Sequence, residues 1–302
     1  MIIESLSLTM KSIHDSLDLR NLIFQNFENA IITNDVNKRQ LLMTFVIVGG
    51  GATGVELSGS LAEIKNYVLP RDYPDIDVND MNIYLIQASN KILECMSKKS
   101  SEQALKDLKE LGVNIWLNSV VTDYDGKIVN IINNNINKQI KSANVIWAAG
   151  VKGALIDGLD KLVIEHGRFL VDNYNRIKKY ENIFAIGDVA MIKDEKYPKG
   201  HPMTVQPAIQ QGIRLAKNLN NMIVGKKMKH FHYVNMGYMA IIGRNKAVCD
   251  FPLKLRFKGF IAWLIWMFIH LINLYGFRNK IITLINWMLQ YYNKSIKLII
   301  RK

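Results

Sequence analysis

The apolar positions of this chain fall into short runs separated by polar turns, the pattern typical of an α/β protein. Residues 45–48 are consecutive apolar β-formers, and helical spacing of apolar residues begins near Thr53. Apolar runs at residues 81–86 and 145–148 predict two further buried strands, and residues 101–111 have helical spacing between them. Strands that alternate with helices in this way predict a parallel sheet.

The remaining pattern before residue 150 predicts helices at the start and a β-hairpin near the end. Residues 8–34 predict one or two helices with a single apolar face, and residues 34–39 predict a polar linker. We expect the helix that begins near Thr53 to stop at Pro70, with a surface loop over residues 70–80. Two strands, at 113–121 and 127–132, are predicted around the turn residues Asp125 and Gly126.

Beyond residue 150 the pattern predicts a second domain and then a C-terminal segment with long apolar runs. Strands are expected at residues 167–171 and 183–186, and a β-pair at 234–248. We therefore divide the chain into residues 1–40, a helical segment and linker; 41–150, a nucleotide-binding domain; 151–232, part of a second α/β domain; and 233–302, a C-terminal segment.

A glycine-rich turn stands between the strand at residues 45–48 and the helix that follows. Gly49, Gly51 and Gly54 fit G-x-G-x-x-G in the setting that this motif requires, a strand before and a helix after. The first glycine allows a tight turn, the second lets the backbone approach a pyrophosphate, and the third lets the helix lie close to the sheet. The N–H groups at the helix N-terminus favour an anion there, so the turn predicts a dinucleotide site.

Gln87 ends the second strand of the predicted sheet, where dinucleotide folds usually carry Asp or Glu. A carboxylate at this position accepts hydrogen bonds from the adenosine ribose and would repel the extra phosphate of NADPH. A neutral amide neither repels that phosphate nor strongly selects it. We expect NADH to be preferred, with NADPH as an alternative; simple drift at a tolerant position explains Gln87 equally well.

Gly187 and Asp188 follow the predicted strand at residues 183–186, which places a carboxylate at the end of a sheet where ligands of open α/β folds bind. An Asp that caps the next helix is an equal alternative. Cys95 and Cys249 are too far apart in sequence for a ligand motif, and His230 and His232 have no third ligand nearby, so we predict no metal site.

Four motifs occur in an order and spacing that is similar to one protein family. They are VIVGGGATGVELSGSLAE at 46–63, VIWAAGVKG at 145–153, NIFAIGDVA at 182–190 and VQPAIQQG at 205–212. Together they resemble the type II NADH:quinone oxidoreductases, membrane-surface flavoenzymes with two dinucleotide-binding domains. The resemblance covers essentially the whole chain, and it implies FAD as well as NADH.

The resemblance also implies roles for individual residues. Gly49, Gly51 and Gly54 would hold the NADH pyrophosphate, and Gln87 stands where the family usually has its ribose-binding Glu. Glu56 would lie near the nicotinamide and the flavin. Ala149 and Gly150 would belong to a cofactor-binding loop. Gly187 and Asp188 would bind the flavin, with Asp188 on its ribityl chain. The glutamines Gln206, Gln210 and Gln211 would lie at the quinone site.

Only some forty residues precede Gly49, whereas the family begins with an FAD-binding strand, glycine turn and helix. The resemblance therefore implies a Rossmann-like flavoprotein that is N-terminally incomplete, with residues 1–40 a remnant of the FAD domain. A separate chain that supplies the missing half, an incorrect start and a decaying gene are all compatible with this. A homodimer is a further expectation.

The C-terminal segment combines apolar runs with positive charge. The formal net charge of the chain is +13, and residues 251–302 contain nine cations and no acid. This interleaving suits an anionic membrane surface better than nucleic acid, so no nucleic-acid partner is expected. Residues 259–277 form 19 positions without formal charge, close to the ~20 that a spanning helix needs. His270 and Asn273 interrupt them, which favours an amphipathic helical membrane anchor that lies in the interface over a single spanning helix.

The predicted function is non-proton-pumping respiratory electron transfer from NADH through FAD to a membrane quinone. The catalytic candidates are Glu56, Gln206 and Gln210, and the expected location is the cytoplasmic face of the cell membrane. Two alternatives remain: a remnant that binds NAD(P)H but not FAD, and a soluble NAD(P)H-dependent flavin reductase with another acceptor.

Overall fold

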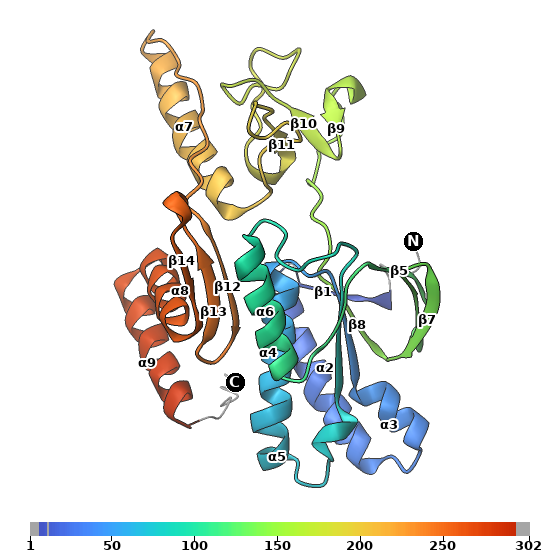
Figure 1. Cartoon of the computed structure of the whole chain (residues 1–302). Coiled ribbons are helices and arrows are strands. Elements are labelled where there is room, and N and C mark those ends of the chain that lie inside the picture. The colour runs from blue at the N-terminus through green and yellow to red at the C-terminus, as the bar shows by residue number, and fades with distance from the viewer. Residues whose placement is uncertain (1–5, 11, 294–302) are drawn as a thin grey trace. The chain divides into compact units, whose positions relative to one another are not determined.

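The computed structural model describes residues 6–10 and 12–293 and divides the chain into two compact units (Figure 1). The first unit contains residues 1–149 and 237–302, and the second contains residues 150–236. Each unit is described here by itself. The cations Lys294, Lys297, Arg301 and Lys302, counted above in the basic C-terminal segment, lie outside the described residues.

The first unit is built on a five-stranded parallel sheet with the strand order β1-β8-β2-β3-β4. The strands are β1 (Leu8–Thr9), β2 (Thr44–Val48), β3 (Asn82–Ile86), β4 (Asn114–Trp116) and β8 (Asn144–Trp147). The predicted central strands and their parallel arrangement are confirmed. Residues 8 and 9 are not helical as expected, because they pair with residues 146 and 147 as the edge strand of this sheet.

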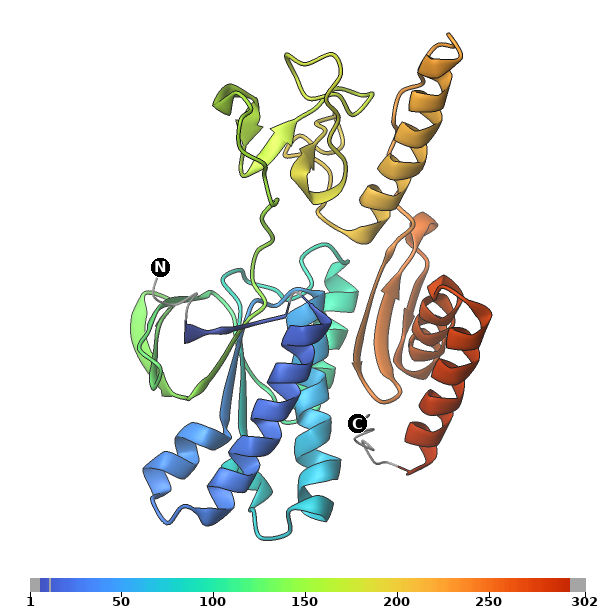
Figure 2. The ribbon, with the colours of Figure 1, turned by 180° about the vertical axis from the view of Figure 1, so that it is seen from behind.

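Alternate side chains of β2 pack on opposite faces of the sheet. Phe45 and Ile47 join the helical core, together with residues of α2 (Ile13–Ile32), α4 (Ala52–Glu63) and α6 (Lys98–Glu110). Val46 and Val48 contact the three-stranded antiparallel sheet of β5 (Ser119–Tyr124), β6 (Ile128–Asn133) and β7 (Ile136–Lys141). Figure 2 shows the helices from behind, with α2 running beside α4. The parallel sheet is therefore covered on both faces, as buried parallel strands require.

Three further expectations for this unit are wrong, each because a local signal was missed. Residues 34–39 are not a linker, since α3 (Val36–Met43) begins there and the Asp35 carboxylate caps it by accepting from two backbone N–H groups. Pro70 does not stop the helix. A π-helical turn (Ile64–Val68) leads into α5 (Leu69–Asp72), whose first turn tolerates a residue without an N–H. The strand expected at 113–121 is divided between two sheets at Asn118, whose φ is 50°.

The C-terminal part of the first unit is a three-stranded antiparallel sheet and two helices. The strands are β12 (Tyr238–Gly243), β13 (Lys246–Asp250) and β14 (Arg256–Lys258), so the predicted β-pair is confirmed. β12 packs on α4 so closely that a Cβ at Gly59 would lie 1.7 Å from the Ile242 carbonyl oxygen. The helices α8 (Gly259–Asn273) and α9 (Phe277–Asn293) follow, with Ala262 of α8 packed against β13.

No helix within the described residues has both the length and the apolar character needed to cross a membrane. The uncharged run of residues 259–277 is not one helix, because α8 ends at Asn273 and α9 begins at Phe277. Gly276 between them has φ 83°.

The second unit has a small sheet with the order β11-β10-β9 and one long helix. Its elements are β9 (Ile164–Glu165), β10 (Arg168–Leu170), β11 (Ala190–Met191) and α7 (Val205–Ile223). Phe169, Val171, Ile177 and Ala190 lie in its core. Residues 183–186 are not a strand as expected. Phe184 forms a single bridge to Arg176, and the backbone then enters a 3₁₀ turn (Gly187–Val189).

Candidate functional site

The glycine turn after β2 is tightly packed on two sides and open on the third. Gly49 has φ 111°, and a Cβ there would lie 2.8 Å from the backbone of Ala149. At Gly54 a Cβ would lie 1.8 Å from the Gly49 carbonyl oxygen, so only glycine lets α4 approach the turn this closely. At Gly51, which caps α4, a Cβ would meet nothing within 4 Å.

This arrangement fits a diphosphate. The first N–H groups of a helix have no partner within the helix, and together with the helix dipole they attract an anion. Gly51 is exposed, and α4 runs for 12 residues from it. The space beside Gly51 therefore lies where a negatively charged ligand would be held by backbone N–H groups.

Gln87 touches this turn directly. Its Oε1 accepts a hydrogen bond from the Gly50 N–H (2.6 Å), and its Nε2 donates to the Ser89 hydroxyl (2.7 Å) and to the Glu94 carboxylate (3.0 Å). Gln87 thus lies at the end of β3 as expected, but its amide is bound to its own protein at both ends.

The turn at Gly187 and Asp188 is the second candidate, in the second unit. Gly187 has φ 71°, and its N–H donates to Oε1 of the buried Gln211 (2.6 Å). The Asp188 carboxylate is half-buried and does not cap a long helix, since Asp188 lies within the 3₁₀ turn and strand β11 follows that turn. Arg168 is 5% exposed; desolvation by burial lowers the pKa of its guanidinium, and the nearby negative charge of Asp188 opposes that shift.

Gln206 and Gln210 bind the extended backbone at the end of the second unit. Gln210 is hydrogen-bonded to Val234 at both ends of its amide, from Nε2 to the carbonyl oxygen (2.9 Å) and from the backbone N–H to Oε1 (3.0 Å). The Met236 N–H donates to Oε1 of Gln206 (3.1 Å). In the described structure these two side chains therefore hold residues 234–236.

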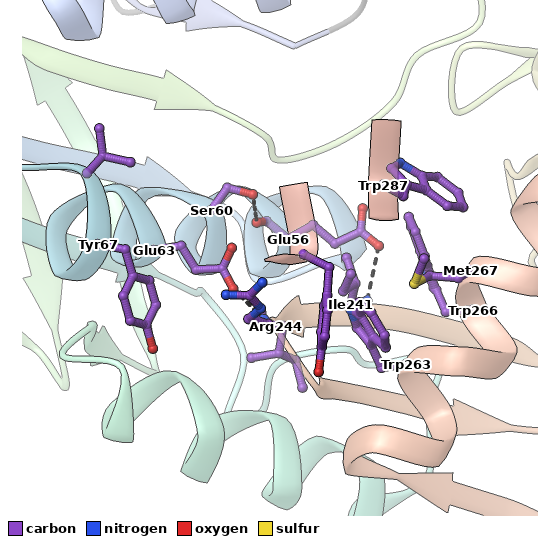
Figure 3. A pocket seen from close by; sticks show the side chains of 14 residues that line it. Glu56, Ser60, Glu63, Tyr67, Ile241, Arg244, Trp263, Trp266, Met267 and Trp287 are labelled. Carbon is purple, nitrogen blue, oxygen red and sulfur yellow. Dashed lines mark hydrogen bonds between the residues drawn. The ribbon is translucent and has the colours of Figure 1, made fainter. Parts of the chain in front are cut away.

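Glu56 lines a pocket of about 360 Å³ in the first unit, between α4, β12 and the helices α8 and α9 (Figure 3). Burial raises the pKa of the Glu56 carboxyl. Hydrogen bonds from the Ile241 N–H (3.3 Å) and from the Trp266 side chain oppose that rise. A carboxyl with a raised pKa inside a pocket is a candidate for proton transfer.

A second carboxyl, Glu63, lies two turns further along α4 in the same pocket. Burial raises its pKa, against a hydrogen bond from the Arg244 N–H and the positive charge of the Arg244 side chain. The Arg244 guanidinium in turn lies 4.4 Å from the centre of the Tyr291 ring. The pocket therefore combines two half-buried carboxyls and a cation with an aromatic wall.

The aromatic wall includes Trp263, Trp266 and Trp287. These three indoles are half-buried. Sequence reasoning missed the pocket, and it also missed Glu63 and Arg244. The only available signal was the seven-residue spacing of Glu56 and Glu63, which places both on one face of α4.

The structure thus brings together Gly49, Gly51, Gly54, Gln87 and Ala149 in the first unit, and Gly187, Asp188 and Gln211 in the second. Gly150 begins the second unit with φ 73°. Glu56 lies on the helix that begins at the glycine turn, in the separate pocket described above. His230, weighed as a metal ligand, is hydrogen-bonded through Nε2 to the Tyr174 hydroxyl (2.7 Å).

Two family models match the sequence. The model of the pyridine nucleotide-disulphide oxidoreductases matches residues 18–212, and that of the NDH2 C-terminal domain matches residues 235–292. Two Mycobacterium tuberculosis proteins named type II NADH:quinone oxidoreductase, Ndh and NdhA, are each 34% identical to this chain. The alignments cover 93% and 95% of this chain but 61% and 62% of those relatives, so the chain spans about three fifths of their length.

Solved structures share the fold. NDH2 from Plasmodium falciparum, determined in complex with NADH, aligns with a TM-score of 0.88 at 20% identity, over 96% of this chain and 74% of that one. The sulfide:quinone oxidoreductase of Aquifex aeolicus aligns with a TM-score of 0.64 at 17% identity, over 87% of this chain and 62% of that one. At these identities the likeness concerns the fold alone.

Proposed function

We propose, since the chain belongs to the pyridine nucleotide-disulphide oxidoreductase family, that it works as a type II NADH:quinone oxidoreductase. In this role it passes electrons from NADH through FAD to a membrane quinone without pumping protons. The curated relatives bear this name, and the order of the four sequence motifs agrees with it.

The observation that carries the proposal is the open side of the glycine turn at Gly51. The crowded positions at Gly49 and Gly54 hold the turn in place, and the uncrowded position at Gly51 lets a diphosphate reach the N-terminus of α4. Gly49, Gly51 and Gly54 bind the NADH pyrophosphate in this proposal, and Gln87 and Ala149 lie beside it.

FAD, when bound, supplies the two-electron chemistry that links a nicotinamide to a quinone. The residues assigned to it are Gly150, Gly187 and Asp188. The half-buried Asp188 carboxylate fits this role because it can accept hydrogen bonds from the hydroxyl groups of a ribityl chain. Gln211 positions that turn through the Gly187 N–H.

Quinone reduction requires protons as well as electrons. Glu56 is the proposed proton-holding group, since its raised pKa keeps the carboxyl partly protonated closer to neutral pH than an exposed glutamate. Gln206, Gln210 and Gln211 are the proposed quinone-side residues from the VQPAIQQG motif. Their amides are bound to the protein's own backbone here, so they act by shaping the site as well as by contact.

The proposed location is the cytoplasmic face of the cell membrane, with α8 and α9 lying in the interface. Large apolar side chains of α8 are exposed, among them Phe260, Ile261, Phe268 and Ile272. Lys254, Arg256 and Lys258 precede them, and Arg278 and Lys280 follow. Exposed apolar residues flanked by cations favour the surface of an anionic bilayer.

The test is to purify the chain, add FAD, remove unbound flavin and measure NADH oxidation with a short-chain quinone. We expect bound flavin, NADH-dependent quinone reduction and loss of activity in Gly51→Ala. A soluble one-electron acceptor in place of quinone separates the NADH half-reaction from the quinone half-reaction. A chain that binds NADH but retains no flavin contradicts the proposal and supports the FAD-deficient alternative.

The membrane arm of the proposal is tested with vesicles of zwitterionic lipid, with and without anionic lipid. The wild-type chain is expected to sediment with anionic vesicles, and Phe260→Glu combined with Phe268→Glu is expected to abolish this. Unchanged sedimentation of the double variant would contradict α8 as the anchor, and a wild-type chain that stays in solution with both kinds of vesicle would support the soluble reductase with another acceptor.

A further inference from the structure

Both N–H donors of the Gln87 amide are used within the protein in the described structure. Its oxygen accepts the Gly50 N–H, and its two N–H donors are directed to Ser89 and Glu94. The Ser89 hydroxyl in turn donates to the Lys91 carbonyl oxygen (2.9 Å). A neutral amide at this position would ordinarily be able to donate to the 2′-phosphate of NADPH, but this one is already bound.

The acceptor at the end of this chain of hydrogen bonds is a carboxylate. Glu94 is exposed, and its Oε1 lies 3.0 Å from the Gln87 Nε2. Gln87 in turn contacts the glycine turn at 2.6 Å. The negative charge that the end of β3 lacks is therefore supplied by a residue seven positions later.

We infer that Glu94 is a specificity-determining residue of the dinucleotide site and makes it select NADH over NADPH. This inference rests on the proposed function, since it assigns the ribose end of the same nucleotide site. The end of β3 is where dinucleotide folds bind the adenosine ribose. A carboxylate there accepts a hydrogen bond from a 2′-hydroxyl but repels a 2′-phosphate.

Lys91 lies in the same loop, but within the part of the chain that the structure describes it forms no ion pair with Glu94. Lys91 Nζ donates to the Met96 carbonyl oxygen (3.3 Å), so its ammonium is engaged within the loop. Gln87 and Ser89 are neutral. Glu94 is therefore the charged group that is hydrogen-bonded to Gln87 at this end of the site.

The experiment is to titrate the purified chain with NADH and with NADPH. The two dissociation constants are compared in the wild type, in Glu94→Gln and in Glu102→Gln. Glu102 is the matched control, an exposed glutamate on α6 that pairs with Lys98 at 3.8 Å. We expect the wild type to prefer NADH, and Glu94→Gln to reduce that preference about tenfold by removing one like-charge interaction. Glu102→Gln is expected to leave the ratio unchanged.

A salt series on the wild type gives a second measurement that needs no variant. Repulsion between an exposed carboxylate and a phosphate is screened, so the NADPH-to-NADH ratio of dissociation constants is expected to approach one at about 1 M salt. An unchanged ratio in Glu94→Gln, or an equal change in Glu102→Gln, overturns the assignment of Glu94, while NADH binding in the same titration leaves the proposed nucleotide site in place. No NADH binding by the wild type overturns both.

Discussion

The two glycine turns of this chain are held by the same kind of hydrogen bond, but one offers donors to a ligand and the other offers acceptors. In each, a glycine N–H donates to a glutamine Oε1 at 2.6 Å, Gly50 to Gln87 in the first unit and Gly187 to Gln211 in the second. The first turn opens onto the N-terminus of a 12-residue helix, whereas the second leads into a three-residue 3₁₀ turn that carries Asp188.

The difference shows how the same glycine-to-glutamine hydrogen bond can support binding sites for two different ligands. A long helix N-terminus offers N–H donors and a positive dipole end, which suit a diphosphate. A carboxylate after a short turn offers acceptors, which suit hydroxyl groups. The packing differs too, since a Cβ at Gly54 would overlap the Gly49 carbonyl oxygen, while a Cβ at Gly187 would lie 3.4 Å from Ala208 Cβ, an ordinary contact distance.

The largest expected effect comes from breaking the packing of the first turn. Gly54→Ala places a methyl group 1.8 Å from a backbone oxygen, and we expect it to lower the free energy of unfolding by about 3 kcal/mol or more. Gly51→Ala is the matched control. Its methyl group meets no protein atom, so stability should change by less than about 1 kcal/mol while NADH affinity falls at least about tenfold.

Urea unfolding and nucleotide titration of both variants check this pair. Equal stability of the two variants would contradict the packing that we assign to Gly54. Undiminished NADH binding by Gly51→Ala would contradict the open diphosphate site.

A smaller effect is expected from removing the brace of the second turn. Gln211→Leu leaves the Gly187 N–H without its acceptor, and an unpaired buried donor costs about 1–3 kcal/mol. Flavin retention should fall, and NADH binding should remain, because Gln87 braces the first turn independently. Flavin absorbance and a nucleotide titration on the same sample give the readout. Parallel loss of both ligands would show that the two turns are not independent.

The smallest expected effect concerns the pocket that begins one turn along α4. Because burial raises the pKa of Glu56, the folded protein binds this proton more readily than the unfolded chain. The contribution to stability is therefore greatest at low pH and declines as pH rises from the unfolded pKa through the raised folded pKa. Glu56→Gln keeps an acceptor for the Ile241 N–H and removes this decline.

We expect Glu56→Gln to be at least as stable as the wild type at pH 7, with a gain of up to about 1 kcal/mol, and to lose quinone reduction. Thermal unfolding across a pH series measures the first outcome, and the quinone assay measures the second. Glu102→Gln, at an exposed position on α6 outside the pocket, is the control for stability. A stability loss in Glu56→Gln that grows with pH would contradict the direction of the pKa shift.

The features that the sequence predicted are those fixed by neighbouring residues. The strand, the glycine turn and the helix from residue 45 to 63 follow from local pattern, and the structure forms them as expected. The position of Gln87 at the end of β3 was also predicted. Its partners were not, because the Gly50 N–H lies 37 residues away and nothing in the pattern aims one at the other.

The features that escaped prediction depend on long-range packing or on unrecognised caps. The pocket joins Glu56 to Ile241 across 185 residues, and it exists only because Gly59 lets α4 press onto β12. The edge strand at Leu8 and Thr9 forms by pairing with β8, which overrides the local helical pattern. α3 was missed although its signal, Asp35 as the N-cap, is local.

The two carboxyls of α4 have one more consequence, for the solution behaviour of the protein. β12 is an edge of its sheet, and an open edge is a template on which a strand from another molecule can add. Glu56 accepts the N–H group of Ile241 on β12, and Glu63 accepts that of Arg244 in the turn that follows, so a side chain of α4 occupies a position that an incoming strand would need. The glutamates that line the pocket thus disfavour aggregation by strand addition at the edge of β12.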